Sequence, residues 1–293
     1  MQNKPDCKRI LITGINGFIG SALSNSLNET GYEVWGVDKF SDSKKQVIAA
    51  NLIEFCDTHD AVNKIPSFPV IIHTAAIAHS KSIFDNKSIY STNVKITENV
   101  LKAFSTPETH IIFLSSVGVY GEDGRDGNVS VEDDLRPSTY YGKSKMKCEE
   151  IIKNNLRNCD ILRLSPVYDK NHLNDIRKRV FLPFSSSLKM IITPSPQFSL
   201  SNINTVIQAV LTIISMGPDG QRVFNIADPV LYSQRELSSW FFNREIIISE
   251  FFARPFYWLT YLLPKKRGYS LRCLYWKMFK SNIYKCNLDM LKK

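Results

Sequence analysis

Residues 9–20 read Arg-Ile-Leu-Ile-Thr-Gly-Ile-Asn-Gly-Phe-Ile-Gly. The apolar run before Gly14 is typical of a buried strand, and the spacing after it predicts a helix over residues 18–30. Glycines at such a turn let the backbone approach a pyrophosphate closely, and the N–H groups of the helix start point toward it. The spacing is one residue wider than the usual dinucleotide fingerprint, so glycines that serve only strand-to-helix packing are the alternative. The residues predicted to form a phosphate-binding loop are Gly14, Asn16, Gly17, Phe18, Ile19 and Gly20.

Strands and helices alternate from this loop onward. Apolar runs recur at 33–37, 70–74, 110–115 and 160–165, and helical spacing recurs at 86–104 and 139–156. This alternation predicts an α/β fold with a doubly wound parallel sheet, the Rossmann arrangement, over residues 1–168. The alternation weakens after Pro166, so residues 169–293 are predicted to form a smaller C-terminal substrate-binding lobe. Within that lobe we expect a helix at 203–215 and a strand near 222–227 that returns to the main sheet.

Composition excludes several classes of protein. With 293 residues, 43% hydrophobic and 22% charged, the chain is of ordinary globular type. The six cysteines form no C-x-x-C pair, which argues against a structural zinc site, and no metal is expected. Residues 244–293 hold eleven basic and three acidic residues, which is +8 of the net charge of +9, and no nucleic-acid-reading motif accompanies them. Without an apolar leader or a membrane-spanning run, we expect a cytoplasmic protein that does not bind nucleic acid.

Acidic residues after the next strands indicate which dinucleotide binds. Asp38 directly follows the run 33–37 and lies 18 residues after Gly20. A carboxylate at this place would accept hydrogen bonds from ribose hydroxyls and repel a 2′-phosphate. NAD is therefore predicted as the cofactor. NADP stays an alternative because Lys39, Lys44 and Lys45 follow and would offset a phosphate's charge. Asp57 is a candidate contact for the adenine amino group, with an ordinary turn aspartate as the alternative.

Ser116, Tyr141 and Lys145 are the candidate catalytic residues. Ser116 closes the run 110–115, whereas Tyr141 and Lys145 open the helix predicted at 139–156, four residues apart on one face. An ammonium beside a phenol favours the phenolate and lowers the pKa of the tyrosine, which lets it move a proton near neutral pH. The serine hydroxyl would hold and polarise the reacting oxygen. Tyr140 is the weaker candidate because no lysine follows it by four residues.

The chain resembles the extended short-chain dehydrogenase/reductase family, in particular its nucleotide-sugar epimerases, dehydratases and reductases. The resemblance covers residues 8–168 well and rests on the segments at 13–20, 73–76, 115–121, 141–145 and 163–168. It implies that Tyr141 is the acid/base, that Lys145 also binds the nicotinamide ribose, and that Ser116 binds the substrate oxygen. It further implies that Ala75 and Asn93 lie beside the cofactor, and that two copies pair as a homodimer.

The second lobe supplies substrate candidates. By resemblance, Asn174 lies where similar enzymes bind a sugar diphosphate, and Arg177, Lys178 and Arg222 would add positive charge. For Arg177 and Lys178, the alternative is that they belong to a solvated basic face of a helix. Asp169 replaces a usual glycine, and residues 198–205 lack the family's arginine and aspartate, so the substrate loop is expected to differ.

These residues favour an NAD(P)-dependent reductase of a dTDP- or UDP-linked 4-keto-6-deoxy sugar, delivering hydride to C4 in surface-polysaccharide (O-antigen, lipopolysaccharide) precursor synthesis. The alternative is a nucleotide-sugar 4-epimerase with tightly bound NAD, which uses the same residues. A 4,6-dehydratase is disfavoured because the segment 116–118 reads Ser-Val-Gly and lacks a carboxylate. A non-catalytic dinucleotide sensor is disfavoured because Tyr141 and Lys145 are both present.

Aromatic and basic residues crowd the segment 251–267. One interpretation is peripheral contact with an anionic membrane surface. The other, which the pattern favours, is a helix of the substrate lobe whose aromatic side chains pack inward.

Overall fold

A computed structural model describes residues 9–41, 46–62, 66–78, 87–121, 127–182 and 185–288. The chain forms two compact units. Unit 1 comprises Met1–Val119, Tyr140–Arg163 and Ile207–Phe224, and unit 2 comprises Tyr120–Thr139, Leu164–Val206 and Asn225–Lys293. This division differs from a single boundary after residue 168, because the chain passes between the units several times.

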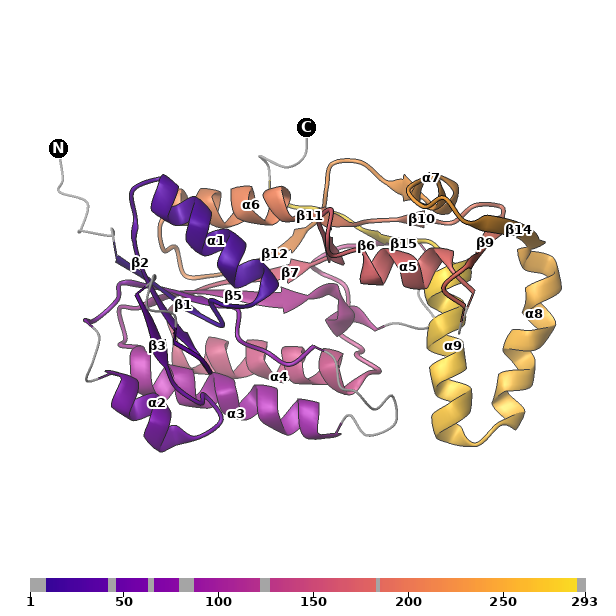
Figure 1. The fold of residues 1–293 in the computed structure, drawn as a ribbon. Helices are drawn as coiled ribbons and strands as arrows, with labels where there is room; N and C mark the ends of the chain where they lie inside the picture. Colours follow the sequence, from indigo (N-terminus) through magenta and orange to yellow (C-terminus); the bar gives the residue numbers. More distant parts are fainter. Residues whose placement is uncertain are drawn as a thin grey trace. The chain divides into compact units, whose positions relative to one another are not determined.

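Unit 1 is built on a seven-stranded sheet in the order β12-β7-β5-β4-β1-β2-β3 (Figure 1). Its strands are β1 (Arg9–Thr13), β2 (Glu33–Asp38), β3 (Val47–Ala49), β4 (Val70–His73), β5 (His110–Ser116), β7 (Asn158–Leu164) and β12 (Gln221–Ile226). Strand β1 pairs in parallel with β2 on one side and with β4 on the other. The chain therefore reverses its direction of winding at β1 and β4, and ligands of such sheets bind beyond the carboxyl ends of the strands at that point.

Helices cover both faces of this sheet. Figure 1 shows α1 (Phe18–Glu29) and α6 (Ile203–Met216) on one face, and α2 (Phe55–Val62), α3 (Lys87–Phe104) and α4 (Tyr140–Asn155) on the other. Apolar side chains of the strands and of α3 and α4, such as Leu11, Ile71, Ile111, Val100 and Ile152, form one buried cluster. Because parallel strands are buried on both faces, they appear in the sequence as continuous apolar runs.

The doubly wound sheet is thus confirmed, as is the return of the strand near 222–227, which pairs beside β7 as β12. Helix α2 was not predicted, and the strand-like run expected before Asp57 is the short strand β3. Strand β3 has three residues and α2 has eight, so both are shorter than the segments over which hydrophobic periodicity identifies a strand or a helix.

Unit 2 consists of short elements. They are β6 (Gly127–Val129), β8 (Val167–Tyr168), α5 (Asn174–Val180), β9 (Leu188–Thr193), β10 (Gln197–Phe198), β11 (Ser201–Asn202), β13 (Tyr232–Ser233), α7 (Gln234–Ser239), β14 (Arg244–Ser249), α8 (Glu250–Leu259), η2 (Thr260–Leu262), α9 (Lys265–Phe279) and β15 (Asn282–Tyr284). A further short 3-10 helix, η1 (Val117–Tyr120), follows β5. The strands form a four-stranded sheet, β13-β10-β15-β6, and two pairs, β11-β8 and β14-β9.

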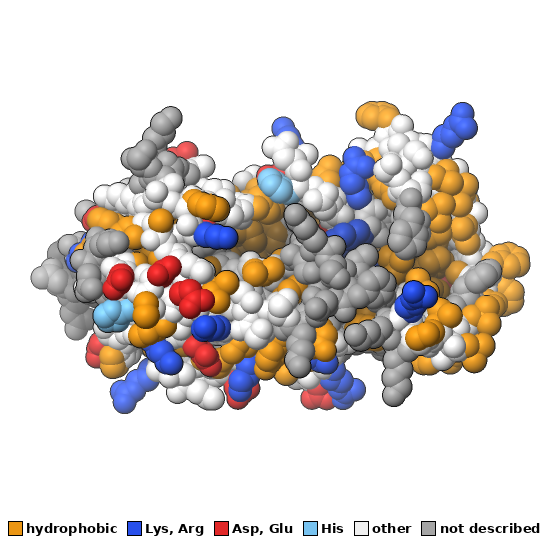
Figure 2. All heavy atoms as spheres, turned by 60° about the horizontal axis from the view of Figure 1, so that its bottom comes forward, with side chains coloured by type: hydrophobic (Ala, Val, Ile, Leu, Met, Phe, Trp, Pro, Cys, Tyr) orange, Lys and Arg blue, Asp and Glu red, His pale blue; other side chains and the backbone are white. Residues whose placement is uncertain are grey.

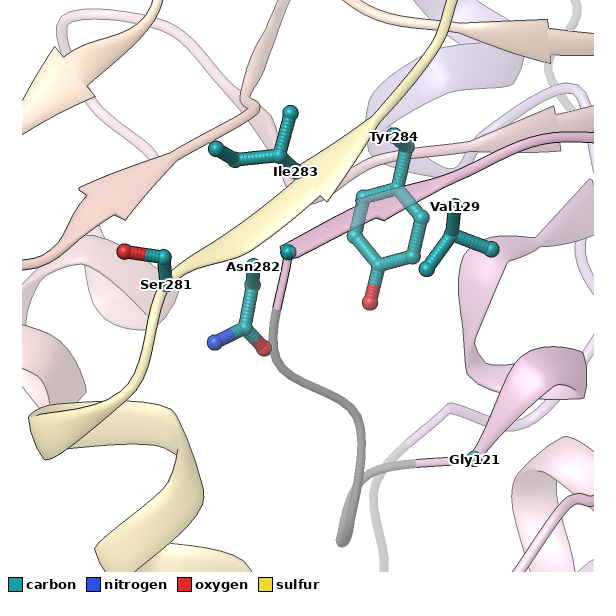
Figure 3. A pocket seen from close by; sticks show the side chains of 7 residues that line it. Gly121, Val129, Ser281, Asn282, Ile283 and Tyr284 are labelled. Carbon is teal, nitrogen blue, oxygen red and sulfur yellow. The ribbon is translucent and has the colours of Figure 1, made fainter.

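A small hollow opens beside β6 and β15 of unit 2 (Figure 3). Gly121, Gly127, Val129 and residues 281–284 line it. The Asn282 amide in its wall already donates hydrogen bonds to the carbonyls of Trp276 and Lys280. None of the predicted catalytic residues lines this hollow, so the candidate site is built elsewhere.

Candidate active site

The glycine loop is shaped by close backbone contacts that only glycine permits. Gly14 has φ +75°, and a Cβ there would lie 2.8 Å from the Cα of Ala75, which follows β4. A Cβ on Gly20 would collide with the carbonyl oxygen of Gly14. Gly17 is the N-cap of α1 and offers no side-chain oxygen to the N–H groups of the first turn. The carboxyl end of β1 therefore has the shape and the polarity of a phosphate cradle.

The carboxylate of Asp38 lies beside this loop although 22 residues separate it from Asn16. Its Oδ2 accepts a hydrogen bond from the backbone N–H of Asn16 (2.9 Å), and its Oδ1 accepts one from Lys39 N–H (2.7 Å). The donor set fits NAD, because an acidic side chain and a glycine loop meet where a ribose would follow a phosphate. Lys44 and Lys45, which bear on NADP, lie outside the described residues.

Two other predicted cofactor residues have different surroundings. Asp57 lies exposed in the first turn of α2 rather than directly after a strand, and its contact with the adenine amino group remains a prediction. Asn93 of α3 is buried: its Oδ1 accepts from Ile77 N–H (2.8 Å), and its Nδ2 donates to the Ile77 carbonyl (3.1 Å) and to Ser144 Oγ (3.0 Å). Asn93 thus ties the segment after β4, which includes Ala75, to the start of α4.

The predicted catalytic residues all belong to unit 1. Ser116 ends β5 and is half-buried, with its Oγ accepting from Gly118 N–H (3.1 Å). Lys145 is buried one helical turn after Tyr141, and its Nζ donates to the Leu114 carbonyl (2.8 Å) and lies 5.9 Å from the centroid of the Tyr141 ring. Burial lowers the pKa of Lys145 to about 8. The ammonium is therefore held near the phenol by β5, as the proposed chemistry requires.

Sequence analysis missed the buried ion pair that positions α4. Glu149, one turn beyond Lys145, accepts hydrogen bonds from Arg163 of β7 (Nη2 to Oε2, 2.7 Å) and from Ser115 of β5 (2.5 Å). All three side chains are buried. The signal was present, since Tyr141, Lys145 and Glu149 recur at four-residue spacing on one helix face. Ser115 is committed to Glu149, and Ser116 remains the serine predicted to bind the substrate.

His73, at the end of β4, was noted in the sequence only as part of the family pattern. It is buried between Thr13 Oγ1 (2.7 Å) and Thr97 Oγ1 (3.0 Å) and stacks on Phe113. Burial, followed by the charge of Lys145, lowers its pKa to about 3. His73 is therefore neutral, and its buried ring adds no second positive charge to that of Lys145.

The substrate candidates separate into two groups. Asn174, Arg177 and Lys178 lie exposed on α5 of unit 2, with the Arg177 guanidinium 4.7 Å from the centroid of the Phe241 ring. Their contact with a diphosphate remains a prediction.

Arg222 needs a correction. It lies near the amino end of β12, away from the ligand-binding edge, and binds buried Asp160 through two hydrogen bonds (2.6 and 2.7 Å). Asp160 also contacts His110 (2.5 Å). Arg222 is therefore a structural ion-pair partner and not a diphosphate ligand.

Comparison with known proteins decides the family. The sequence profile of the NAD dependent epimerase/dehydratase family matches residues 10–227. The chain belongs to this family. The UDP-glucose 4-epimerase of Vibrio cholerae is 27% identical over an alignment of 241 residues that covers 75% of this chain and 71% of that protein. This confirms the resemblance to the nucleotide-sugar branch of the extended short-chain dehydrogenases/reductases.

A second family member and a solved structure extend this result. The N-acetyl-alpha-D-glucosaminyl-diphospho-ditrans,octacis-undecaprenol 4-epimerase of Escherichia coli O157:H7 is 23% identical over 229 residues, covering 75% of this chain and 67% of that protein. A short-chain dehydrogenase/reductase superfamily protein from Agrobacterium tumefaciens with bound NAD aligns with a TM-score of 0.67 at 18% identity, over 82% of this chain and 85% of that one. The structural likeness shows that the Rossmann-type fold is shared.

Proposed function

We propose that this chain is an NAD-dependent 4-epimerase of a nucleotide-activated hexose. The observation that carries the proposal is Lys145, buried one turn after Tyr141 and hydrogen-bonded to β5 beside Ser116. The names of the two curated relatives, both 4-epimerases, favour this activity over the 4-keto-sugar reductase that the sequence suggested. A dehydratase is disfavoured because η1, which follows Ser116, contains no carboxylate for the elimination step.

The residues that would hold NAD are the glycines of the loop at 14–20, Asp38 at the ribose and Lys145 at the nicotinamide ribose. NAD held by these residues would supply reversible hydride transfer. Asp38 favours NAD over NADP, because its carboxylate would repel a 2′-phosphate.

The chain's own residues handle the proton and the sugar oxygen. Tyr141 takes the proton of the sugar 4-hydroxyl as the carbonyl forms, and gives it back when the hydroxyl re-forms. The Lys145 ammonium stabilises the phenolate form of Tyr141 that accepts the proton, and Ser116 donates a hydrogen bond to the same sugar oxygen. Epimerisation requires that the keto sugar present its opposite face between the two proton transfers. One set of residues can therefore produce either configuration at C4.

The first experiment measures turnover by protein purified without added cofactor. Interconversion of UDP-glucose and UDP-galactose, or of their N-acetyl forms, with no net consumption of nicotinamide supports the proposal. Consumption of external NADH or NADPH with a dTDP-4-keto-6-deoxyhexose, without epimerisation, overturns it in favour of the reductase.

Two neighbouring tyrosines provide a matched pair of variants. Tyr141→Phe removes the phenolic proton but keeps the ring, and turnover is expected to fall by about 10²-fold or more. Tyr140→Phe alters an exposed side chain that precedes it on α4, and turnover is expected to stay near that of the natural chain. Equal turnover by both variants would remove Tyr141 from the mechanism.

A further inference from the structure

The helical hairpin formed by α8, η2 and α9 has a packed inner side. Tyr257 of α8 lies 4.7 Å from Tyr275 of α9 between ring centroids, and its hydroxyl accepts a hydrogen bond from Trp276 Nε1 (3.3 Å). A Cβ on Gly268 would collide with the Thr260 carbonyl oxygen, so α9 and η2 are in close backbone contact. The hairpin is therefore an ordered element, shown in yellow and gold in Figure 1.

Its outer side exposes large apolar side chains. Phe251 is 72% exposed, Phe252 69%, Trp258 67% and Leu262 82%. Phe251 and Trp258, and likewise Phe252 and Leu259, are seven residues apart, so they form two adjacent rows along α8. Figure 2 shows hydrophobic side chains gathered at the right-hand end of this face, where Figure 1 places the hairpin. Inward packing is thus wrong for these residues, although it holds for Tyr257 and Tyr275.

Positive charge accompanies this apolar surface. Lys265, Lys266 and Arg267 directly follow Leu262, Leu263 and Pro264 in the sequence and begin α9. The acidic group at the base of α8, Glu250, is already paired with Lys280 (2.8 Å) and Arg254 (3.6 Å). Arg272 lies over the ring of exposed Tyr261 at 4.3 Å. An apolar surface of this kind, followed in the sequence by a basic cluster, marks an interaction site.

We propose that this outer surface of α8 and η2 docks on an anionic membrane surface. Aromatic and aliphatic side chains would enter the boundary between headgroups and acyl chains, and the basic cluster at 265–267 would lie at the anionic headgroups. None of the helices in the described part of the chain combines the length and the apolar character of a membrane span. A second copy is the poorer occupant, because symmetric pairing through this surface would bring two basic clusters together.

The test is co-sedimentation with vesicles of phosphatidylcholine and phosphatidylglycerol, with pure phosphatidylcholine vesicles as the neutral comparison. The full chain is expected to bind the anionic vesicles, and to be released as the salt concentration rises. Trp258→Ser combined with Leu262→Ser is expected to weaken binding at least about tenfold. Reversing the charges of residues 265–267 to glutamate is expected to abolish the preference for anionic lipid.

The control variant is Met216→Ser, which removes an exposed apolar side chain outside the hairpin and is expected to bind like the natural chain. Unfolding midpoints of all variants establish that they fold. Failure of the natural chain to sediment, or equal sedimentation with neutral vesicles, overturns the proposal. So does a double variant that binds vesicles normally but changes from dimer to monomer, because the surface would then be a contact between copies. Hexose epimerisation is measured with soluble substrate, so neither result depends on the other.

Discussion

Replacing Lys145 with methionine is expected to abolish turnover and, at the same time, to stabilise the protein. The side chain is 3% exposed, and its Nζ has the Leu114 carbonyl as a hydrogen-bond partner. Methionine has a similar length and no charge, so it fills the same space without an ammonium to desolvate.

The magnitude follows from the pKa of Lys145, which falls from its ordinary value of 10.5 to about 8 on folding because of burial. At about 1.4 kcal/mol for each tenfold change in the proton equilibrium, keeping the ammonium in the folded state near neutral pH costs about 3 kcal/mol. Loss of the hydrogen bond to the Leu114 carbonyl offsets about 1 kcal/mol. The variant should therefore gain about 2 kcal/mol in free energy of unfolding.

The sign of the pH dependence is also determined. Between about pH 8 and 10.5 the unfolded natural chain keeps the lysine proton and the folded chain does not, so its stability rises with pH over that window. The variant lacks this group, and its advantage should be full below about pH 8 and should disappear toward pH 10.5.

Urea denaturation of both proteins without cofactor, at about pH 7 and about pH 10, measures this difference. Lys147→Met is the matched control, because that lysine lies exposed on the same helix and its denaturation midpoint is expected to stay near that of the natural chain. A Lys145→Met variant less stable than the natural chain at neutral pH, or an advantage that does not change with pH, would refute the reasoning.

Three further predictions concern unit 1. Gly20→Ala forces a Cβ against the Gly14 carbonyl oxygen. NAD affinity measured by calorimetry should therefore fall at least about tenfold, and the free energy of unfolding should fall by about 1–3 kcal/mol. Unchanged affinity would contradict the phosphate-loop assignment. Arg222→Met removes both guanidinium hydrogen bonds from buried Asp160 and leaves its contact with His110, so stability should fall by about 2–3 kcal/mol with KM unchanged. A raised KM at natural stability would restore Arg222 as a substrate ligand. The kcat/KM of the natural chain should decline as pH rises through about 8, where Lys145 loses its proton, and a profile level to pH 10 would contradict its role as an ammonium.

Most strands of the main sheet, the glycine loop and the placing of Tyr141 and Lys145 on one helix face could be predicted from the sequence. These features are local, because a buried parallel strand is a continuous apolar run and a helix brings residues four apart onto one face. Asp38 was also found in this way, since the edge of a parallel sheet gathers the residues that follow its strands.

Which polar groups bind one another could not be predicted from the sequence, because it depends on tertiary packing. Arg222 appeared available for a diphosphate until β12 placed it against Asp160 of β7, 62 residues earlier in the chain. The pair of Glu149 and Arg163 depends in the same way on how α4 lies on the sheet. The direction of the aromatic side chains in the hairpin also depends on packing, because a helix rich in Phe, Tyr and Trp on several faces has no single apolar stripe. The buried side of α8 is the side that contacts α9 and η2. A contact between separate elements produces no periodic pattern in the sequence.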